Sequence, residues 1–194
     1  MITKDREYRH FAVELRATAE NEMIVEGYAA RFNESTVLYS FDGIDYSEVI
    51  ERSAFDSCNM NDVVMNYNHA GKPVARTKNN TLQLNVDEVG LKIRADLSGT
   101  EEGRRLYEEI KGGYIDKMSF AFKVDDGGDS YDKDTHTRHI NTVQRLYDVA
   151  AVDLPAYDTT SIYARSYFSA EAEREKAEAL ELRRRQLKLI IMCG

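Results

Sequence analysis

Residues 81–95 read TLQLNVDEVGLKIRA, and this stretch decides the class of fold. Leu82, Leu84 and Val86 alternate with polar residues, which is typical of a half-buried β-strand. Glu88-Val89-Gly90 predicts a turn, and the alternation resumes in residues 91–95. We therefore expect a β-hairpin here and antiparallel β-structure around it.

Similar apolar patterns extend to both sides of this hairpin. They predict further strands at residues 11–15, 23–32, 62–67, 117–124 and 143–154. Gly27 lies inside the second of these and predicts a bulge or a close approach of another backbone. The polar residues 125–138 contain Gly127-Gly128 and predict a hairpin or a mobile loop.

One internal helix is expected after residue 100. Ser98 or Thr100 can cap it, acidic residues occupy its first turn, and Gly112-Gly113 ends it. The composition changes after Phe168, where Ser169 can cap a long helix rich in Ala, Glu, Arg and Leu. Its apolar positions form one stripe: Ala177, Leu180, Leu187 and Ile191.

These patterns together predict an α+β fold. We expect a β-rich domain at residues 1–167 and a C-terminal amphipathic helical appendage at 168–194. The appendage has two interpretations. In the functional interpretation, it docks the protein on scaffold or capsid protein, or it is a tail that self-cleavage removes. In the structural interpretation, it packs on the body or pairs with the same helix of another subunit.

Composition narrows the possible functions. The 194-residue chain has a net charge of −8, which argues against nucleic-acid binding because phosphate contacts need a basic surface. Cys58 and Cys193 lie far apart and form no CxxC pattern, so a zinc site or a disulfide framework is not expected. No apolar run approaches the roughly 20 residues that span a bilayer, and the N-terminus has no signal-peptide pattern. We expect a cytoplasmic protein without membrane association and without a metal or organic cofactor.

His69 ends the apolar strand at Asn66-Tyr67-Asn68-His69, and Ala70-Gly71 is expected to turn the chain. A histidine at a strand end can project into a cleft and act as a general base. From its position alone, a turn histidine that is hydrogen-bonded to the backbone is the more common case. His136 and His139 lie beside the polar loop, and without a third ligand nearby they are a weak prediction of a metal site.

Ser119 lies between Met118 and Phe120 in an apolar strand. A serine there is often a small core residue, but it can act as a nucleophile if a histidine from another strand reaches its oxygen. No G-x-S-x-G motif is present, so an α/β-hydrolase elbow is excluded.

Seven pieces of sequence now become informative together. They are, in order, Gly27-Tyr28-Ala29-Ala30-Arg31-Phe32, Glu48-Val49-Ile50-Glu51-Arg52-Ser53-Ala54-Phe55, Asn66-Tyr67-Asn68-His69, Val74-Ala75-Arg76-Thr77, Gly90-Leu91, residues 113–122 with Met118-Ser119-Phe120, and Leu154-Pro155-Ala156-Tyr157. In this order they resemble the caudovirus prohead protease family over roughly residues 22 to 165.

This resemblance implies a fold similar to the herpesvirus assemblins, with a β-barrel-like antiparallel core and flanking helices. It implies a serine endopeptidase that cleaves scaffold and capsid-protein segments, and usually itself, inside the immature phage head in the host cytoplasm. The major capsid protein, scaffold segments and a second copy of the chain are the implied partners. The alternative is a non-catalytic scaffold or assembly-core protein of the same fold.

The resemblance also implies Ser119 as nucleophile and His69 as base. The family usually has an acidic residue followed by Val-Ser in the strand before the Pro-Ala motif, where this chain reads Asp148-Val149-Ala150. Asp148 is therefore the implied third member of a triad, and Asp153 is the runner-up. For an oxyanion hole, Gly112-Gly113 and the loop after the last strand are candidates.

Overall fold

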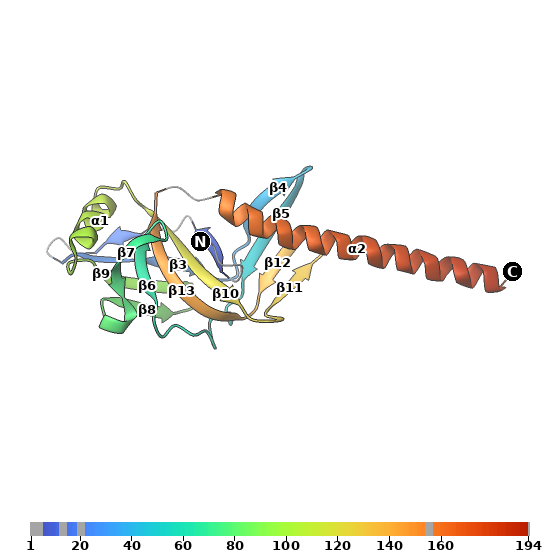
Figure 1. Ribbon diagram of the computed structural model, residues 1–194, viewed down its shortest axis with the longest axis horizontal. Helices are drawn as coiled ribbons and strands as arrows, with labels where there is room; N and C mark the ends of the chain where they lie inside the picture. The colour runs from blue at the N-terminus through green and yellow to red at the C-terminus, as the bar shows by residue number, and fades with distance from the viewer. Residues whose placement is uncertain (1–5, 12–14, 19–21, 154–156, 194) are drawn as a thin grey trace.

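The computed structural model describes residues 6–11, 15–18, 22–153 and 157–193, with the backbone alone at 10–11, 157–165 and 187–193. In these residues the strands form three sheets, α1 lies at one end of the body, and α2 extends far beyond the other end (Figure 1). The class is α+β, as expected.

The largest sheet carries the candidate site. Its strands lie in the order β1 (Glu7–Phe11), β10 (Lys117–Val124), β13 (Val143–Val152), β6 (Val64–Tyr67) and β7 (Ala70–Arg76). One face of its centre is apolar, and Met65, Met118, Phe120 and Val149 are fully buried in the core. The strand predicted at residues 117–124 is present with those bounds.

Two four-stranded sheets complete the body. One has the order β11 (Asp129–Asp132), β12 (Thr137–Ile140), β5 (Ile44–Ile50) and β4 (Thr36–Phe41). The other has the order β2 (Arg16–Ala17), β3 (Ile24–Arg31), β9 (Gly90–Asp96) and β8 (Leu82–Val86). A short 3-10 helix, η1 (Thr77–Asn79), leads from β7 toward β8.

The predicted barrel needs a correction. Each of the three sheets is open among the described strands, and two pairings are parallel, β13 with β6 and β12 with β5. The core is therefore mixed rather than antiparallel. Alternation in a sequence shows which face of a strand is buried but not which strand lies beside it, so it could not predict these parallel pairs. The assemblin likeness stays a prediction.

The hairpin predicted at residues 81–95 is confirmed as β8 and β9. Gly90 begins β9 where β3 passes close by, and a Cβ there would lie 2.0 Å from the carbonyl oxygen of Ala30. Only glycine fits this approach. The irregularity expected at Gly27 occurs slightly later in β3, between Tyr28 and Ala30, while Gly27 pairs regularly with Ile93.

The internal helix is confirmed as α1 (Glu101–Lys111). Thr100 is its cap, since its hydroxyl oxygen accepts from the Gly103 amide at 2.9 Å. Leu106, Tyr107 and Ile110 are buried against the body. The polar stretch at 125–138 forms the predicted hairpin, β11 and β12.

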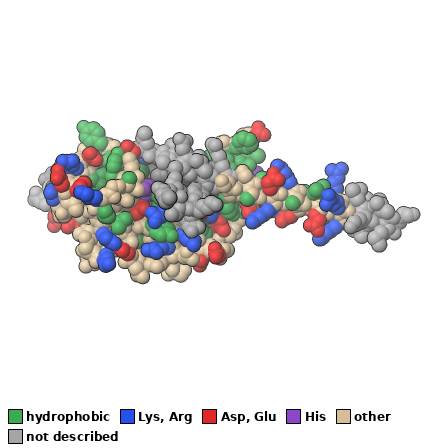
Figure 2. Space-filling view, in the orientation of Figure 1, with side chains coloured by type: hydrophobic (Ala, Val, Ile, Leu, Met, Phe, Trp, Pro, Cys, Tyr) green, Lys and Arg blue, Asp and Glu red, His purple; other side chains and the backbone are tan. Residues whose placement is uncertain are grey.

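The prediction that Ser169 begins the C-terminal helix is wrong. Helix α2 runs from Tyr157 to Cys193, and Phe168 is buried among Tyr39, Tyr46 and Tyr131. The packing of Phe168 on these tyrosines of the body stabilises the helix across Ser169 and overrides the capping signal there. Beyond it, Leu180 and Leu182 are exposed, and Figure 2 shows charges of both signs along the projecting helix. No helix in the described part of the chain is long and apolar enough to cross a membrane.

Candidate active site

Ser119 lies on β10, an inner strand of the sheet, with β1 on one side and β13 on the other. Its side chain is completely buried. Ala150 lies opposite it on β13, in the register Ser119↔Ala150. Residues opposite each other share a face of the sheet, so the methyl group of Ala150 lies beside Ser119.

Asp148 lies two residues earlier on β13 and is 4% exposed. It pairs with Ala121 of β10 and, on its other side, with Val64 of β6. The pairing with β10 shifts register next to it, between Ala121 and Phe122. Such bulges re-aim side chains next to active sites.

His69 lies in the two-residue turn between β6 and β7, not before it. The structure corrects the expected turn at Ala70-Gly71, because Tyr67 already pairs with Ala70 across Asn68 and His69. Both turn residues have positive φ, 49° at Asn68 and 55° at His69. Positive φ at both positions is typical of the tight hairpin turn, and it is uncommon for residues other than glycine.

This turn is held from outside by Asp153. Its carboxylate accepts from the Tyr67 hydroxyl at 2.8 Å and from Nδ2 of Asn68 at 3.1 Å. The backbone N–H of Asn68 also donates to the Ala151 carbonyl at 3.0 Å. Asp153 therefore holds the turn that carries His69. The two candidate aspartates thus have different contacts: Asp153 bonds the turn, and Asp148 bonds the imidazole of His69.

The three side chains meet although they come from distant parts of the chain. Nδ1 of His69 lies 2.5 Å from Oδ1 of Asp148, and Nε2 lies 2.5 Å from Oγ of Ser119. With its proton on Nδ1, the imidazole donates to Asp148 and accepts the Ser119 hydroxyl. In this tautomer the imidazole can take a proton from the serine while the carboxylate stabilises the imidazolium that forms.

The two histidines considered as metal ligands, His136 and His139, have other partners. Nδ1 of His136 lies 2.9 Å from the Tyr131 hydroxyl, and Nδ1 of His139 lies 2.7 Å from Glu51. No group of His, Cys, Asp or Glu in the described residues is arranged to hold a metal ion.

The glycine pair is not free to form an oxyanion hole. The Gly112 amide donates to Glu108 at 2.9 Å and the Gly113 amide to Ile110 at 3.0 Å, so both close the end of α1. This corrects the first of the two oxyanion candidates. The second candidate, the loop after β13, falls on residues 154–156 with Pro155 and lies outside the described residues.

Sequence analysis missed two neighbours of the triad, Tyr8 on β1 and Arg6 just before that strand. Arg6 Nη1 lies 3.8 Å from Oδ2 of Asp148, and the ring of Tyr8 contacts the ring of His69. Only the pattern from residue 11 onward had predicted a strand. The alternation of charged and aromatic residues before it, with Arg6 and Tyr8 on one face and Glu7 and Arg9 on the other, was a usable signal.

A buried serine, a histidine and an aspartate linked in this order have the arrangement of the Ser-His-Asp triad of serine hydrolases. A family model described as Caudovirus prohead serine protease matches residues 11–175. The chain belongs to this family, that of the serine peptidases of the tailed-phage prohead. No curated protein and no solved structure matches the chain.

Proposed function

We propose that this protein is the endopeptidase of phage head maturation and cleaves capsid-protein and scaffold segments, and itself, inside the immature head in the host cytoplasm. The observation that carries the proposal is the position of the His69 ring, with Nε2 at Ser119 and Nδ1 at Asp148. Family membership supports the same reaction class and the setting in the prohead.

In the proposed reaction, Oγ of Ser119 attacks the scissile carbonyl while Nε2 of His69 takes the hydroxyl proton. The tetrahedral intermediate collapses, the C–N bond breaks, and His69 gives the proton to the leaving amine. Water then attacks the acyl-enzyme with His69 again as base, which releases the acid and restores the serine. Asp148 holds the imidazole in the required tautomer throughout.

Burial of Ser119 adds a requirement to this proposal. The side chain is 0% exposed, so a substrate peptide reaches Oγ only when the chain that covers it moves. Local opening of this kind is common where binding segments must move.

The test is co-expression with the major capsid protein of the same phage, read by intact-mass spectrometry. Wild type is compared with Ser119→Ala and with Ser57→Ala, which changes an exposed serine outside the site. We expect wild type and Ser57→Ala to shorten the capsid protein or themselves, and Ser119→Ala to do neither. Identical fragments from all three proteins would show that Ser119 is not the nucleophile. Assembly of capsids without any cleavage would favour the scaffold alternative.

A further inference from the structure

Two alternate residues at the start of β1 face the triad, Tyr8 on the strand and Arg6 just before it. The ring centroids of Tyr8 and His69 lie 4.7 Å apart with an interplanar angle of 72°, so the rings meet edge to face. Arg6, on the same face, reaches Oδ2 of Asp148 at 3.8 Å and covers the ring of Tyr147 at 4.0 Å from its centroid. Tyr8 therefore contacts the base, and Arg6 contacts its carboxylate partner.

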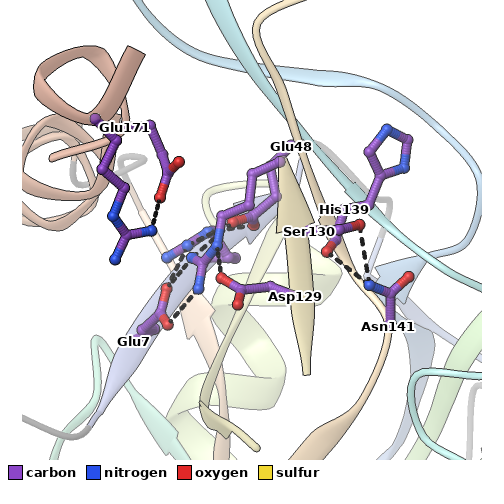
Figure 3. A network of polar contacts seen from close by, with 10 residues as sticks. Glu7, Glu48, Asp129, Ser130, His139, Asn141 and Glu171 are labelled. Atoms are coloured by element: carbon purple, nitrogen blue, oxygen red, sulfur yellow. Dashed lines mark hydrogen bonds and ion pairs between the residues drawn. The ribbon is translucent and has the colours of Figure 1, made fainter. Parts of the chain in front are cut away.

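The opposite face of β1 is anchored by buried charges. Arg9, 1% exposed, donates from Nε and Nη2 to the Glu48 carboxylate at 2.5 and 2.7 Å. Glu7 accepts from Nη2 of Arg9 at 2.6 Å and from Nη1 of Arg138 at 2.7 Å. Figure 3 shows the carboxylates of Glu7, Glu48 and Asp129 converging on this network. A fully paired network of this kind holds its members in one arrangement.

The network extends to the root of the C-terminal helix. The Arg138 guanidinium donates to Asp129 of β11 at 2.6 Å and lies 4.4 Å from the centre of the Tyr167 ring of α2. The network therefore ties one face of β1 to β5, β11, β12 and α2. On the other face of the strand, Tyr8 contacts His69 of the triad. A side chain held this firmly can define the position of what it contacts.

His69 needs such support. Its backbone comes from the β6–β7 turn, while its ring reaches back to β13 and β10. Two hydrogen bonds in the ring plane fix the ring's direction but leave it able to tilt about the line between them. An aromatic edge against the imidazole opposes that tilt.

We propose that Tyr8 is a positioning residue of the active site, which holds the His69 imidazole in the plane needed to take the Ser119 proton. The inference rests on the proposed function of the triad. It concerns a residue that precedes the segment matched by the family, residues 11–175. The ring, not the hydroxyl, makes the contact that carries it.

The experiment measures labelling of the purified full chain by a rhodamine-tagged fluorophosphonate, in which Ser119 Oγ bonds to phosphorus and fluoride leaves. Tyr8→Leu is expected to lower the maximal labelling rate about tenfold and to change the probe's half-saturating concentration by less than about twofold. Tyr8→Phe keeps the ring and is expected to label within about twofold of wild type. Tyr114→Leu changes a tyrosine ring that is 82% exposed and serves as the control.

A second readout separates mispositioning from loss of fold. In the Ser119→Ala background, Tyr8→Leu is expected to shift the His69 ring proton resonances, because the ring current of Tyr8 is lost, while the thermal unfolding midpoint of Tyr8→Leu stays close to that of the parent. Equal labelling of Tyr8→Leu and wild type, or an equal loss in Tyr8→Phe and Tyr8→Leu, would overturn the inference. Labelling or cleavage that persists in Ser119→Ala would instead overturn the proposed function.

Discussion

Oδ1 of Asp148 lies 2.5 Å from Nδ1 of His69. Asp153, further along the chain, bonds Tyr67 and Asn68 instead. Asp148→Asn is therefore expected to lower kcat for cleavage on the order of 10³–10⁴-fold, because an amide favours the wrong imidazole tautomer. Asp153→Asn keeps one acceptor for the turn and is expected to cost less than about tenfold. The measurement is the rate of capsid-protein cleavage at matched concentration. An equal loss in both variants would contradict the assignment.

The buried ion pairs of Glu7 with Arg9 and Arg138 predict how the free energy of unfolding depends on pH. Burial alone would raise the pKa of Glu7, but the guanidinium groups of Arg9 and Arg138 outweigh it and lower this pKa to about 2. The unfolded chain keeps the ordinary value near 4.5. The stabilisation is therefore complete above about pH 4.5 and is lost as pH falls toward about 2, and its size is about 3 kcal/mol.

Urea unfolding at pH 6 and pH 3 tests this. Glu7→Gln is expected to lower the free energy of unfolding at pH 6 and to differ less from wild type at pH 3, where wild type has itself lost part of the stabilisation. Glu108→Gln, on the exposed side of α1, serves as the control. A difference between Glu7→Gln and wild type that is the same at both pH values would show that the charge of Glu7 is not responsible.

The thiol of Cys58 gives an independent check of the packing between the sheets. Burial raises its pKa to about 11, although the Leu146 backbone partly offsets this. In a Cys193→Ser background at pH 8, iodoacetamide should alkylate Cys58 more than about a hundredfold more slowly than an ordinary thiol, because only the thiolate reacts. Mass spectrometry follows the reaction, and full speed should return in 8 M urea, about the usual denaturing concentration. Rapid alkylation of the folded protein would show that Cys58 is accessible.

Much of the fold could be predicted because its strands show their burial locally. β8, β9 and β10 alternate or are continuously apolar, and α1 has both a cap and an apolar face. The β4–β5 hairpin was missed because β4 is largely unburied and its sequence lacks clean alternation. Its Asp42-Gly43 turn was nevertheless a usable signal, since both residues have positive φ between the paired Phe41 and Ile44.

The candidate site was less predictable from local pattern. His69 lies 50 residues from Ser119 and 79 from Asp148, and the parallel pairing of β13 with β6 brings them together. Neither alternation nor composition encodes that pairing, so the three residues were singled out through family resemblance. The contacts of Tyr8 and Arg6 depend on the pairing of β1 with β10, which local pattern does not show either.

The part of α2 around Phe168 is expected to contribute to the stability of the body. Phe168 is 1% exposed, and its ring centroid lies 5.0 Å from that of Tyr46 and 5.6 Å from that of Tyr131. Phe168→Ala leaves a cavity there and should lower the free energy of unfolding by about 3–5 kcal/mol.

Leu182→Ala is the matched control, since Leu182 lies on the same helix and is 58% exposed. It should change the free energy of unfolding by less than about 0.5 kcal/mol. Urea unfolding of both variants, each at two protein concentrations, decides between two arrangements of the helix. A large loss in Phe168→Ala alone places the start of the appendage beyond residue 168. A comparable loss in Leu182→Ala would mean that the projecting helix is itself buried, against a second copy of the chain, and the loss should then shrink on dilution because association depends on concentration.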